Sequence, residues 1–310
     1  MALKVGGLTV TLPATELVKA SQDAHVTFAD GTHLVLGFTG NDVLTGTGGN
    51  SYLDGLSGND RIEAGDGHHY ILGDAGSDTL IGGSGNDHIY GFGPNPGPDG
   101  GDSIFGGAGN DYIQGNAGVD TIDGGDRNDR IFGGQDNDRI SGGNGNDSIN
   151  GNLGSDTIDG GAGDDTVRGD QSADVLRGGD GNDVLLGDLG ADTLTGGAGS
   201  DVFQLRGNDA AFLGLNGLLG QRETITDFQV GTDHISLGFV PQAVHQVGAL
   251  SLVDGLAGVL STLSGHSADI AQLTVGNDSY LFYSSSNGTI ADSVIDLQGV
   301  HDTIDLTSFV

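Results

Sequence analysis

Aspartate recurs at a fixed nine-residue interval between residues 37 and 204. The interval is broken once, between Asp87 and Asp102, and sixteen of the eighteen positions that it defines are Asp. Short carboxylates after Gly-rich turns supply hard oxygen ligands, and oxygen ligands suit calcium, which takes about six to eight of them. We therefore expect multiple Ca2+ ions. The candidate metal ligands are Asp42, Asp60, Asp78, Asp87, Asp102, Asp111, Asp120, Asp129, Asp138, Asp147, Asp156, Asp165, Asp174, Asp183, Asp192 and Asp201.

Each aspartate is the sixth residue of a unit written Gly-Gly-x-Gly-x-Asp-x-apolar-x. The glycines allow a tight turn, because Gly reaches positive φ without a Cβ penalty. The last three residues fit a short strand whose middle side chain faces inward. All eighteen of these middle residues, from Leu44 to Phe203, are apolar. Turn and strand alternate, so the pattern predicts coils of eighteen residues, two units each.

The aspartate columns oppose folding in the absence of a cation. Carboxylates stacked at a strand spacing of about 4.8 Å repel by roughly 0.9 kcal/mol per neighbouring pair in water. Each coil buries only two aliphatic side chains against the entropy of ordering eighteen residues. We therefore expect the array to be unfolded or molten without calcium, as in other folds that depend on a metal.

The repeat resembles that of the RTX (repeats-in-toxin) calcium-binding proteins. The units that begin at Gly82, Gly142 and Gly178 match its pattern at every position. The resemblance implies an all-β fold, a right-handed parallel β-roll with two nonapeptides per coil and calcium held between stacked coils. It also implies export by type I secretion machinery to an extracellular or cell-surface location.

Three regions follow from these patterns. Residues 1–36 are predicted to form a short β cap, with a hairpin around Ala29-Asp30-Gly31. Residues 37–204 form the roll, with an insertion at 91–96 that should project as a loop. Residues 205–310 form a mainly β C-terminal module. Its segment Thr224–Leu237, with the pattern Asp-Phe-x-x-Gly-x-Asp, resembles the region that follows the repeats in type I substrates.

The composition limits the classes of binding partner that we expect for this protein. The formal net charge is -33, and 43 acidic residues face 10 Lys and Arg. No basic patch is available for nucleic acid, so nucleic acid is not an expected partner. The chain has no Cys, which excludes disulfides and thiol chemistry. The first thirty residues contain no uninterrupted apolar stretch of signal-peptide length.

Two members of the Asp series, at 51 and 69, are Ser51 and His69. Both fall on the same edge of the predicted roll, so we expect calcium there to be weak or absent. His68 and His69 together suggest a transition-metal site, but a degenerate repeat is the reading we favour.

Three residues, Arg127, Asp136 and Ser172, replace the Gly at the fourth position of their units. We expect an uncommon backbone conformation there, and a distorted turn around Asp129, because Arg tolerates that conformation less well than Asp.

Catalytic patterns are missing from the sequence. No His-Glu-x-x-His helix signal is present, and Gly-Ser-Gly runs fall inside the predicted calcium turns. We therefore expect a non-enzymatic, secreted calcium-binding structural protein. It folds on calcium outside the cell and self-assembles, as a homo-oligomer or lattice, into a surface layer or extracellular matrix. Cell-surface polysaccharide is a possible partner.

Two alternatives stay open. One is a secreted effector that acts on host membranes, although the Leu-rich stretches at 210–219 and 247–263 are too short to span a bilayer. The other is an adhesin module that binds carbohydrate or ice through outward aromatic side chains, for which ordinary strand surface is the favoured reading. These side chains are Tyr52, Tyr70, Tyr90, Tyr112, Phe105 and Phe132.

Overall fold

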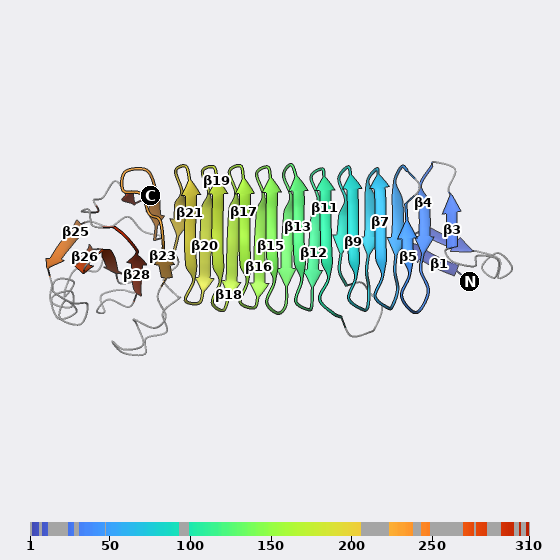
Figure 1. Ribbon diagram of the computed structural model, residues 1–310, viewed down its shortest axis with the longest axis horizontal. Coiled ribbons are helices and arrows are strands. Elements are labelled where there is room, and N and C mark those ends of the chain that lie inside the picture. The colour runs from blue at the N-terminus through green and yellow to red at the C-terminus, as the bar shows by residue number, and fades with distance from the viewer. Residues whose placement is uncertain are drawn as a thin grey trace.

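A computed structural model of the chain describes residues 2–5, 8–11, 24–27, 31–46, 48–92, 99–205, 223–237, 243–248, 269–275, 277–283, 293–300, 304, 308 and 309. These residues form strands, turns and bends but no α-helix. Most of the strands lie in two parallel sheets that form an elongated roll (Figure 1). The all-β parallel roll predicted from the nonapeptides is confirmed.

The first sheet, here the even sheet, has twelve strands in the order β24-β22-β20-β18-β16-β14-β12-β10-β8-β6-β4-β3. Its strands are β3 (Ala24–Thr27), β4 (His33–Leu36), β6 (Ser51–Asp54), β8 (His69–Leu72), β10 (His88–Tyr90), β12 (Tyr112–Asn116), β14 (Arg130–Gly134), β16 (Ser148–Leu153), β18 (Thr166–Gln171), β20 (Val184–Leu189), β22 (Val202–Gln204) and β24 (His234–Ser236).

The second sheet, here the odd sheet, has fourteen strands in the order β25-β26-β27-β28-β23-β21-β19-β17-β15-β13-β11-β9-β7-β5. Its strands are β5 (Val43–Thr45), β7 (Arg61–Asp66), β9 (Thr79–Ser84), β11 (Ser103–Ala108), β13 (Thr121–Asp126), β15 (Arg139–Asn144), β17 (Thr157–Ala162), β19 (Val175–Asp180), β21 (Thr193–Ala198), β23 (Glu223–Ile225), β25 (Ala243–Gly248), β26 (Asp269–Val275), β27 (Asp278–Tyr283) and β28 (Ser293–Leu297).

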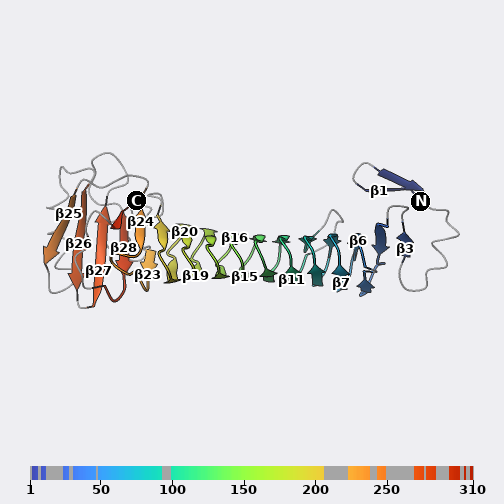
Figure 2. The same ribbon diagram turned by 90° about the horizontal axis from the view of Figure 1, so that it is seen from above.

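The register follows from two nonapeptides per coil. Ile122 pairs with Ile140 and Ile140 with Ile158 in the odd sheet, each eighteen residues on. Figure 2 shows the chain passing back and forth between the two layers of the roll. The eighth residues of all units point between the layers, where they are 0 to 2% exposed and form one continuous core from Leu44 to Phe203.

The strand ladder extends past both ends of the repeat array. The predicted hairpin is present, because β3 pairs with β4 antiparallel, and β4 then pairs with β6 in parallel. At the other end β23 pairs with β21 and β24 with β22. The roll therefore crosses the pattern boundaries at 36 and 204.

The two ends of the roll carry different additions. A separate antiparallel pair, β1 (Ala2–Val5) and β2 (Leu8–Thr11), belongs to the N-terminal region. The strands β25 to β28 extend the odd sheet at the opposite end, with antiparallel β26-β27-β28 pairing (Figure 1). The insertion predicted at 91–96 and the Leu-rich stretches lie largely outside the described residues.

The three replacements at the fourth position adopt the predicted left-handed backbone. Arg127, Asp136 and Ser172 have φ of +79°, +70° and +81°. The expected distortion around Asp129 is not seen, because Asp129 keeps the same two column hydrogen bonds as its neighbours. Three side-chain types thus accept a conformation that Gly adopts in most other units.

Candidate metal sites

The predicted aspartates form two columns, one at each edge of the roll. Column A precedes the odd-sheet strands and contains Asp42, Asp60, Asp78, Asp102, Asp120, Asp138, Asp156, Asp174 and Asp192. Column B precedes the even-sheet strands and contains Ser51, His69, Asp87, Asp111, Asp129, Asp147, Asp165, Asp183 and Asp201. The structure thus brings all sixteen predicted ligands into two rows.

Within a column each carboxylate uses one oxygen to join two coils. Asp147 Oδ1 accepts the backbone N–H of Asp129 at 2.7 Å, and Asp165 Oδ1 accepts that of Asp147 at 2.7 Å. Column A repeats the pattern, as in the 2.8 Å bond from the Asp138 N–H to Asp156 Oδ1. The first oxygen is therefore structural and links each coil to the one before it.

The second oxygen has no hydrogen-bond partner within the described structure. This holds for Oδ2 of every one of the sixteen aspartates except Asp42, and these fifteen side chains are at most 3% exposed. Buried polar atoms without a partner are rare, because desolvation costs about 1–3 kcal/mol and more for charged groups. A row of buried, unpartnered carboxylate oxygens fits a hard cation between the coils, so the donor set agrees with calcium.

In most units the first residue is a Gly, which makes room for that oxygen. A Cβ built on Gly142 would lie 2.4 Å from Asp147 Oδ2 and 2.4 Å from the carbonyl oxygen of Gly160. Asp147 belongs to the same unit, whereas Gly160 lies one coil further on. Carboxylate and carbonyl oxygens therefore converge where a side chain is missing.

Burial raises the pKa of the fifteen buried column aspartates, from Asp60 to Asp201. The pKa of Asp102 is raised to about 8 by burial, and the nearby Asp120 and Asp78 carboxyls add to the effect. The pKa of Asp120 is raised to about 7, again mainly by burial. In both cases a hydrogen bond from a backbone N–H pulls the pKa down, but by less than burial raises it. A charged column therefore needs a positive partner at neutral pH.

Side chains at the fifth position form a second ladder that the sequence analysis missed. Asn110 Oδ1 accepts the backbone N–H of Asn128 at 3.2 Å, and Asn128 Oδ1 accepts that of Asn146 at 3.0 Å. The ladder beside column B continues through Asp164 and Asn182 to Ser200. The signal in the sequence is the recurrent Asn before Asp. It becomes interpretable once residues eighteen apart are known to stack.

The two predicted gaps in column B contain no carboxylate. Ser51 Oγ donates to the carbonyl oxygen of Gly49 at 3.3 Å. His69 is 2% exposed, neither ring nitrogen has a hydrogen-bond partner in the described structure, and burial lowers its pKa. His68 is exposed, and its Nδ1 accepts the N–H of Asn86 at 2.8 Å. One imidazole is exposed and the other buried, which gives no support to a shared metal site.

Aromatic side chains stack on the outer even sheet beside these gaps. Tyr52 and Tyr70 lie with ring centroids 5.3 Å apart and planes 5° apart, and Tyr70 stacks on His88 at 6.2 Å. Tilted contacts at 5.2 to 5.8 Å join Tyr90, Tyr112 and Phe132 to this aromatic row. Five of the six predicted outward aromatics therefore lie on one face, whereas Phe105 belongs to the odd sheet.

The C-terminal end of column B was also missed. Asp233 takes the next column position, because its Oδ1 accepts the Asp201 N–H at 3.2 Å. Asp227 binds the preceding turn, since its two oxygens accept the N–H groups of Gly196 and Gly197 at 2.9 and 2.8 Å. The segment Asp-Phe-x-x-Gly-x-Asp is thus a last nonapeptide, with Phe228 in place of the first Gly. Its signal was the spacing of Gly231, Asp233 and buried Ile235.

Column A likewise continues to Glu223. Thr224 pairs with Thr193, and its N–H donates to the carbonyl oxygen of Asp192. Glu223, which directly precedes Thr224, therefore occupies the position that Asp has in earlier coils. The sequence hides this position because no glycine turn precedes Glu223.

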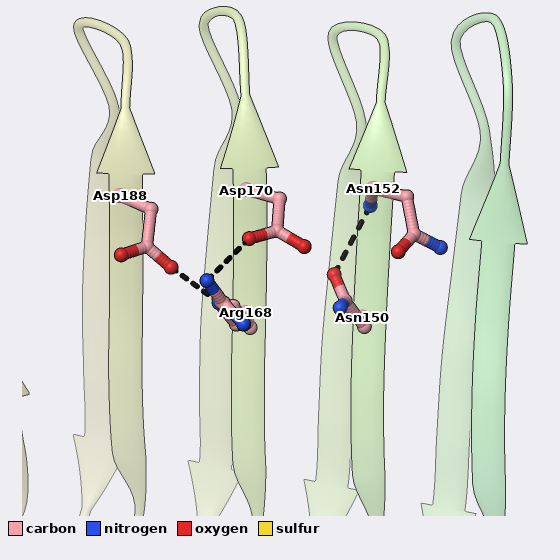
Figure 3. A network of polar contacts seen from close by, with 5 residues as sticks. All are labelled: Asn150, Asn152, Arg168, Asp170 and Asp188. Carbon is pink, nitrogen blue, oxygen red and sulfur yellow. Dashed lines mark hydrogen bonds and ion pairs between the residues drawn. The ribbon is translucent and has the colours of Figure 1, made fainter.

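Carboxylates outside the columns are balanced differently. Arg168 on β18 forms an ion pair with Asp170 at 2.6 Å and another with Asp188 one coil further on (Figure 3). Both acids are at the second position of their units. These carboxylates have a protein cation, whereas the column carboxylates do not.

The arrangement favours calcium over zinc. No group of three or more His, Cys, Asp or Glu side chains that could hold a metal gathers anywhere in the described ranges. Zinc sites are built mainly from such side chains, whereas calcium readily takes backbone carbonyl oxygens. Each site would combine column carboxylates with turn carbonyls.

Comparisons agree with this geometry. The family model described as RTX calcium-binding nonapeptide repeat matches residues 36–68, 70–93, 97–131, 123–158, 132–167, 141–176 and 168–203. Because these matches cover more than half of the chain, the protein belongs to the RTX calcium-binding nonapeptide repeat family. Repeats of this family bind calcium, and proteins that carry them are typically secreted.

Two solved structures are similar to parts of the chain. A subunit of the mannuronan C5-epimerase of Azotobacter vinelandii, determined in solution, is 23% identical over 60% of this chain and 78% of its own, with a TM-score of 0.24. The extracellular lipase LipA of Serratia marcescens is 15% identical over 76% of this chain, with a TM-score of 0.27. The match spans 40% of the length of the lipase. No curated protein gives a significant match.

Proposed function

We propose that this protein is a secreted structural protein that folds on calcium outside the cell and then self-assembles into a surface layer or extracellular matrix. In this proposal type I secretion machinery exports the unfolded chain, and the protein is not an enzyme. The columns support the calcium step, because their unpartnered oxygens need a cation before the coils can stack.

The observation that carries the assembly step is the open N-terminal end of the odd sheet. Among the described strands, β5 has a neighbour on one side only, β7, and Val43 at its start is 65% exposed. The even sheet continues further at the same end through β4 to its own edge strand, β3. An uncovered edge strand is a template for pairing with another chain. End-to-end pairing of rolls would extend the odd sheet from one molecule to the next.

Light scattering and negative-stain electron microscopy test the proposal, with calcium raised from excess chelator to about 10 mM, the weak end of extracellular affinities. Sheets, tubes or filaments that form with calcium and dissolve with chelator are expected. A compact monomer at every calcium concentration contradicts assembly.

A matched pair of variants tests the role of β5. Val43→Lys places a charge on the open edge strand, whereas Val175→Lys places it at the same repeat position in the middle of the odd sheet, where Val175 is 38% exposed. We expect the first variant to stay monomeric in calcium and the second to assemble. The reverse result would move the interface to the sheet face.

A further inference from the structure

A hollow lies at the corner where the even sheet turns toward column A. Its volume is about 640 Å3, within the usual range for small-ligand sites. Three neighbouring strands, β12, β14 and β16, supply its floor. The residues that line it are Phe92, Asp99, Tyr112, Gln114, Asn116, Ala117, Phe132, Gly134, Gln135, Asn152 and Leu153.

A glycine in a row of asparagines helps to open the hollow. Asn116 pairs with Gly134, and Gly134 pairs with Asn152, so the three occupy the second position of successive coils. Asn116 and Asn152 have φ of +80° and +73°, whereas Gly134 has φ of +129°, and a Cβ built on it would lie 2.0 Å from the carbonyl oxygen of Asn116. Gly134 has no side chain, so the row is interrupted between its two neighbours.

The walls present rings and free amides. Phe132 ends the aromatic row, and Asn150 takes its place in the next coil. Within the described residues, the side-chain amides of Gln114, Gln135 and Asn152 make no hydrogen bond; in Figure 3 the bond at Asn152 comes from its backbone N–H to Asn150 Oδ1. Rings beside amides that lack partners match a sugar, whose C–H faces pack on aromatics while its hydroxyls exchange hydrogen bonds with amides.

Charge decides which carbohydrate fits. No Lys or Arg lines the hollow, and Asp99 lies at its border. Two cations lie nearby: Arg130, whose guanidinium carbon is 5.1 Å from the centre of the Phe132 ring, and Arg168, which is paired with Asp170 and Asp188 (Figure 3). The whole chain carries a net charge of -33, so an anionic glycan would be repelled.

We propose that this hollow, here called the glycan hollow, binds units of a neutral polysaccharide. Two of its strands, β12 and β14, are followed in the chain by the column aspartates Asp120 and Asp138. Glycan binding therefore requires the calcium-folded roll. The inference goes beyond the proposed function, because it assigns a ligand class to one face and does not require assembly.

Affinity electrophoresis in calcium tests the site. The native protein runs through gels that contain hydroxyethylcellulose, laminarin or dextran as neutral probes, and carboxymethylcellulose as an anionic one. We expect at least one neutral polysaccharide to retard the protein, with retardation lost in chelator. Absence of retardation by every neutral probe, or retardation by carboxymethylcellulose alone, overturns the proposal.

Three variants connect the result to the hollow. Phe132→Ala removes the last ring, and Gln114→Ala removes an amide that lines the hollow. Each is expected to weaken binding about tenfold or more. The control Phe105→Ala removes a 40% exposed ring from the opposite sheet and should bind normally. Unchanged binding by both test variants overturns the site.

Folding and assembly are measured separately from binding. Circular dichroism in calcium shows whether each variant forms the roll; if one of the two test variants does not, Gln135→Ala replaces it, with the same expected loss. Light scattering of the same samples reports assembly. A protein that assembles but binds no glycan contradicts this inference alone, whereas one that binds but stays monomeric contradicts only the proposed function.

Discussion

At the scale of single residues, every column aspartate except Asp42 uses its two oxygens for different roles. Oδ1 accepts a backbone N–H from the previous coil, and Oδ2 is left without a partner. An amide in the same place keeps the first function and loses the second, because its oxygen still accepts the N–H while its NH2 group repels a cation. The two roles can therefore be separated by one substitution.

Asp147→Asn makes that separation in the middle of column B. We expect the variant to fold in calcium but to bind less of it. Loss of one site lowers the free energy of unfolding by about 2.7 kcal/mol when calcium is a hundredfold above its dissociation constant. Isothermal titration calorimetry and calcium-dependent melting measure both effects. The control is Asp180→Asn, at an exposed residue outside the columns, which should change neither.

At the scale of elements, burial raises the pKa of carboxyl groups along both columns. Burial raises the pKa of Asp102 and Asp129 to about 8 and that of Asp183 to about 6, from an ordinary value of 3.8. Without a cation, the folded roll therefore holds protons that the unfolded chain has released. Its stability is highest below about pH 4 and is lost as the pH rises through the folded values.

The pH dependence consequently has opposite signs with and without metal. In chelator, we expect β-structure measured by circular dichroism to increase as the pH falls from about 8 to about 5. In calcium, protons compete for the same oxygens, so the calcium midpoint should rise over that interval. A calcium midpoint that falls on acidification contradicts this account.

The aromatic row is the second element that holds coils together. It runs beside Ser51 and His69, where column B has no carboxylate, so ring stacking adds to the strand pairing that joins these coils in the even sheet. An aromatic pair contributes about 0.5–1.5 kcal/mol beyond the area that it buries. Tyr70 makes three such contacts, with Tyr52, His88 and Tyr90.

Tyr70→Ala should therefore loosen the N-terminal coils selectively. We expect faster amide hydrogen exchange in β6, β8 and β10 at intermediate calcium, by a factor that corresponds to about 1–3 kcal/mol, and little change in β16 to β20. Phe105→Ala is the matched control, because Phe105 is similarly exposed, at 40% against 39%, and no ring contact is found for it among the described residues. Equal effects of both variants would show that lost area, not stacking, is responsible.

At the scale of the whole molecule, the sequence predicts the features that recur in every unit but not the contacts that join one coil to the next. Asp120 and Ile122 are recognisable because every unit carries the same local turn and strand; Ile122 lies in the core as predicted, and calcium binding by Asp120 stays a prediction. The column positions of Asp233 and Glu223 were not predicted, because the segments before these residues lack the glycine pattern. The fifth-position ladder and the stacking of the aromatic row were not predicted, because both join residues eighteen or more apart in the chain. Their partners are defined only once the coils are stacked.

The last prediction concerns the net charge of the protein and its effect on calcium-dependent folding. A net charge of -33 opposes compaction, and two explanations of calcium dependence compete: general screening of that charge, or ions bound between coils. Sodium chloride at 1 M shortens the Debye length to about 3 Å, below the coil spacing of about 4.8 Å, but buried charges are screened much less than exposed ones. Since the column aspartates other than Asp42 are at most 3% exposed, salt should not replace calcium.

Magnesium separates the two explanations further. It carries the same charge as calcium, but it demands near-octahedral geometry and keeps several waters, which a dry site of turn carbonyls and column oxygens does not allow. We expect circular dichroism and sedimentation velocity to show a cooperative transition to an elongated, folded particle with millimolar calcium, and an unfolded chain with equal magnesium or with 1 M sodium chloride. Folding in either alternative would mean that charge neutralisation suffices, and the unpartnered Oδ2 atoms would then need protons rather than bound ions as their partners.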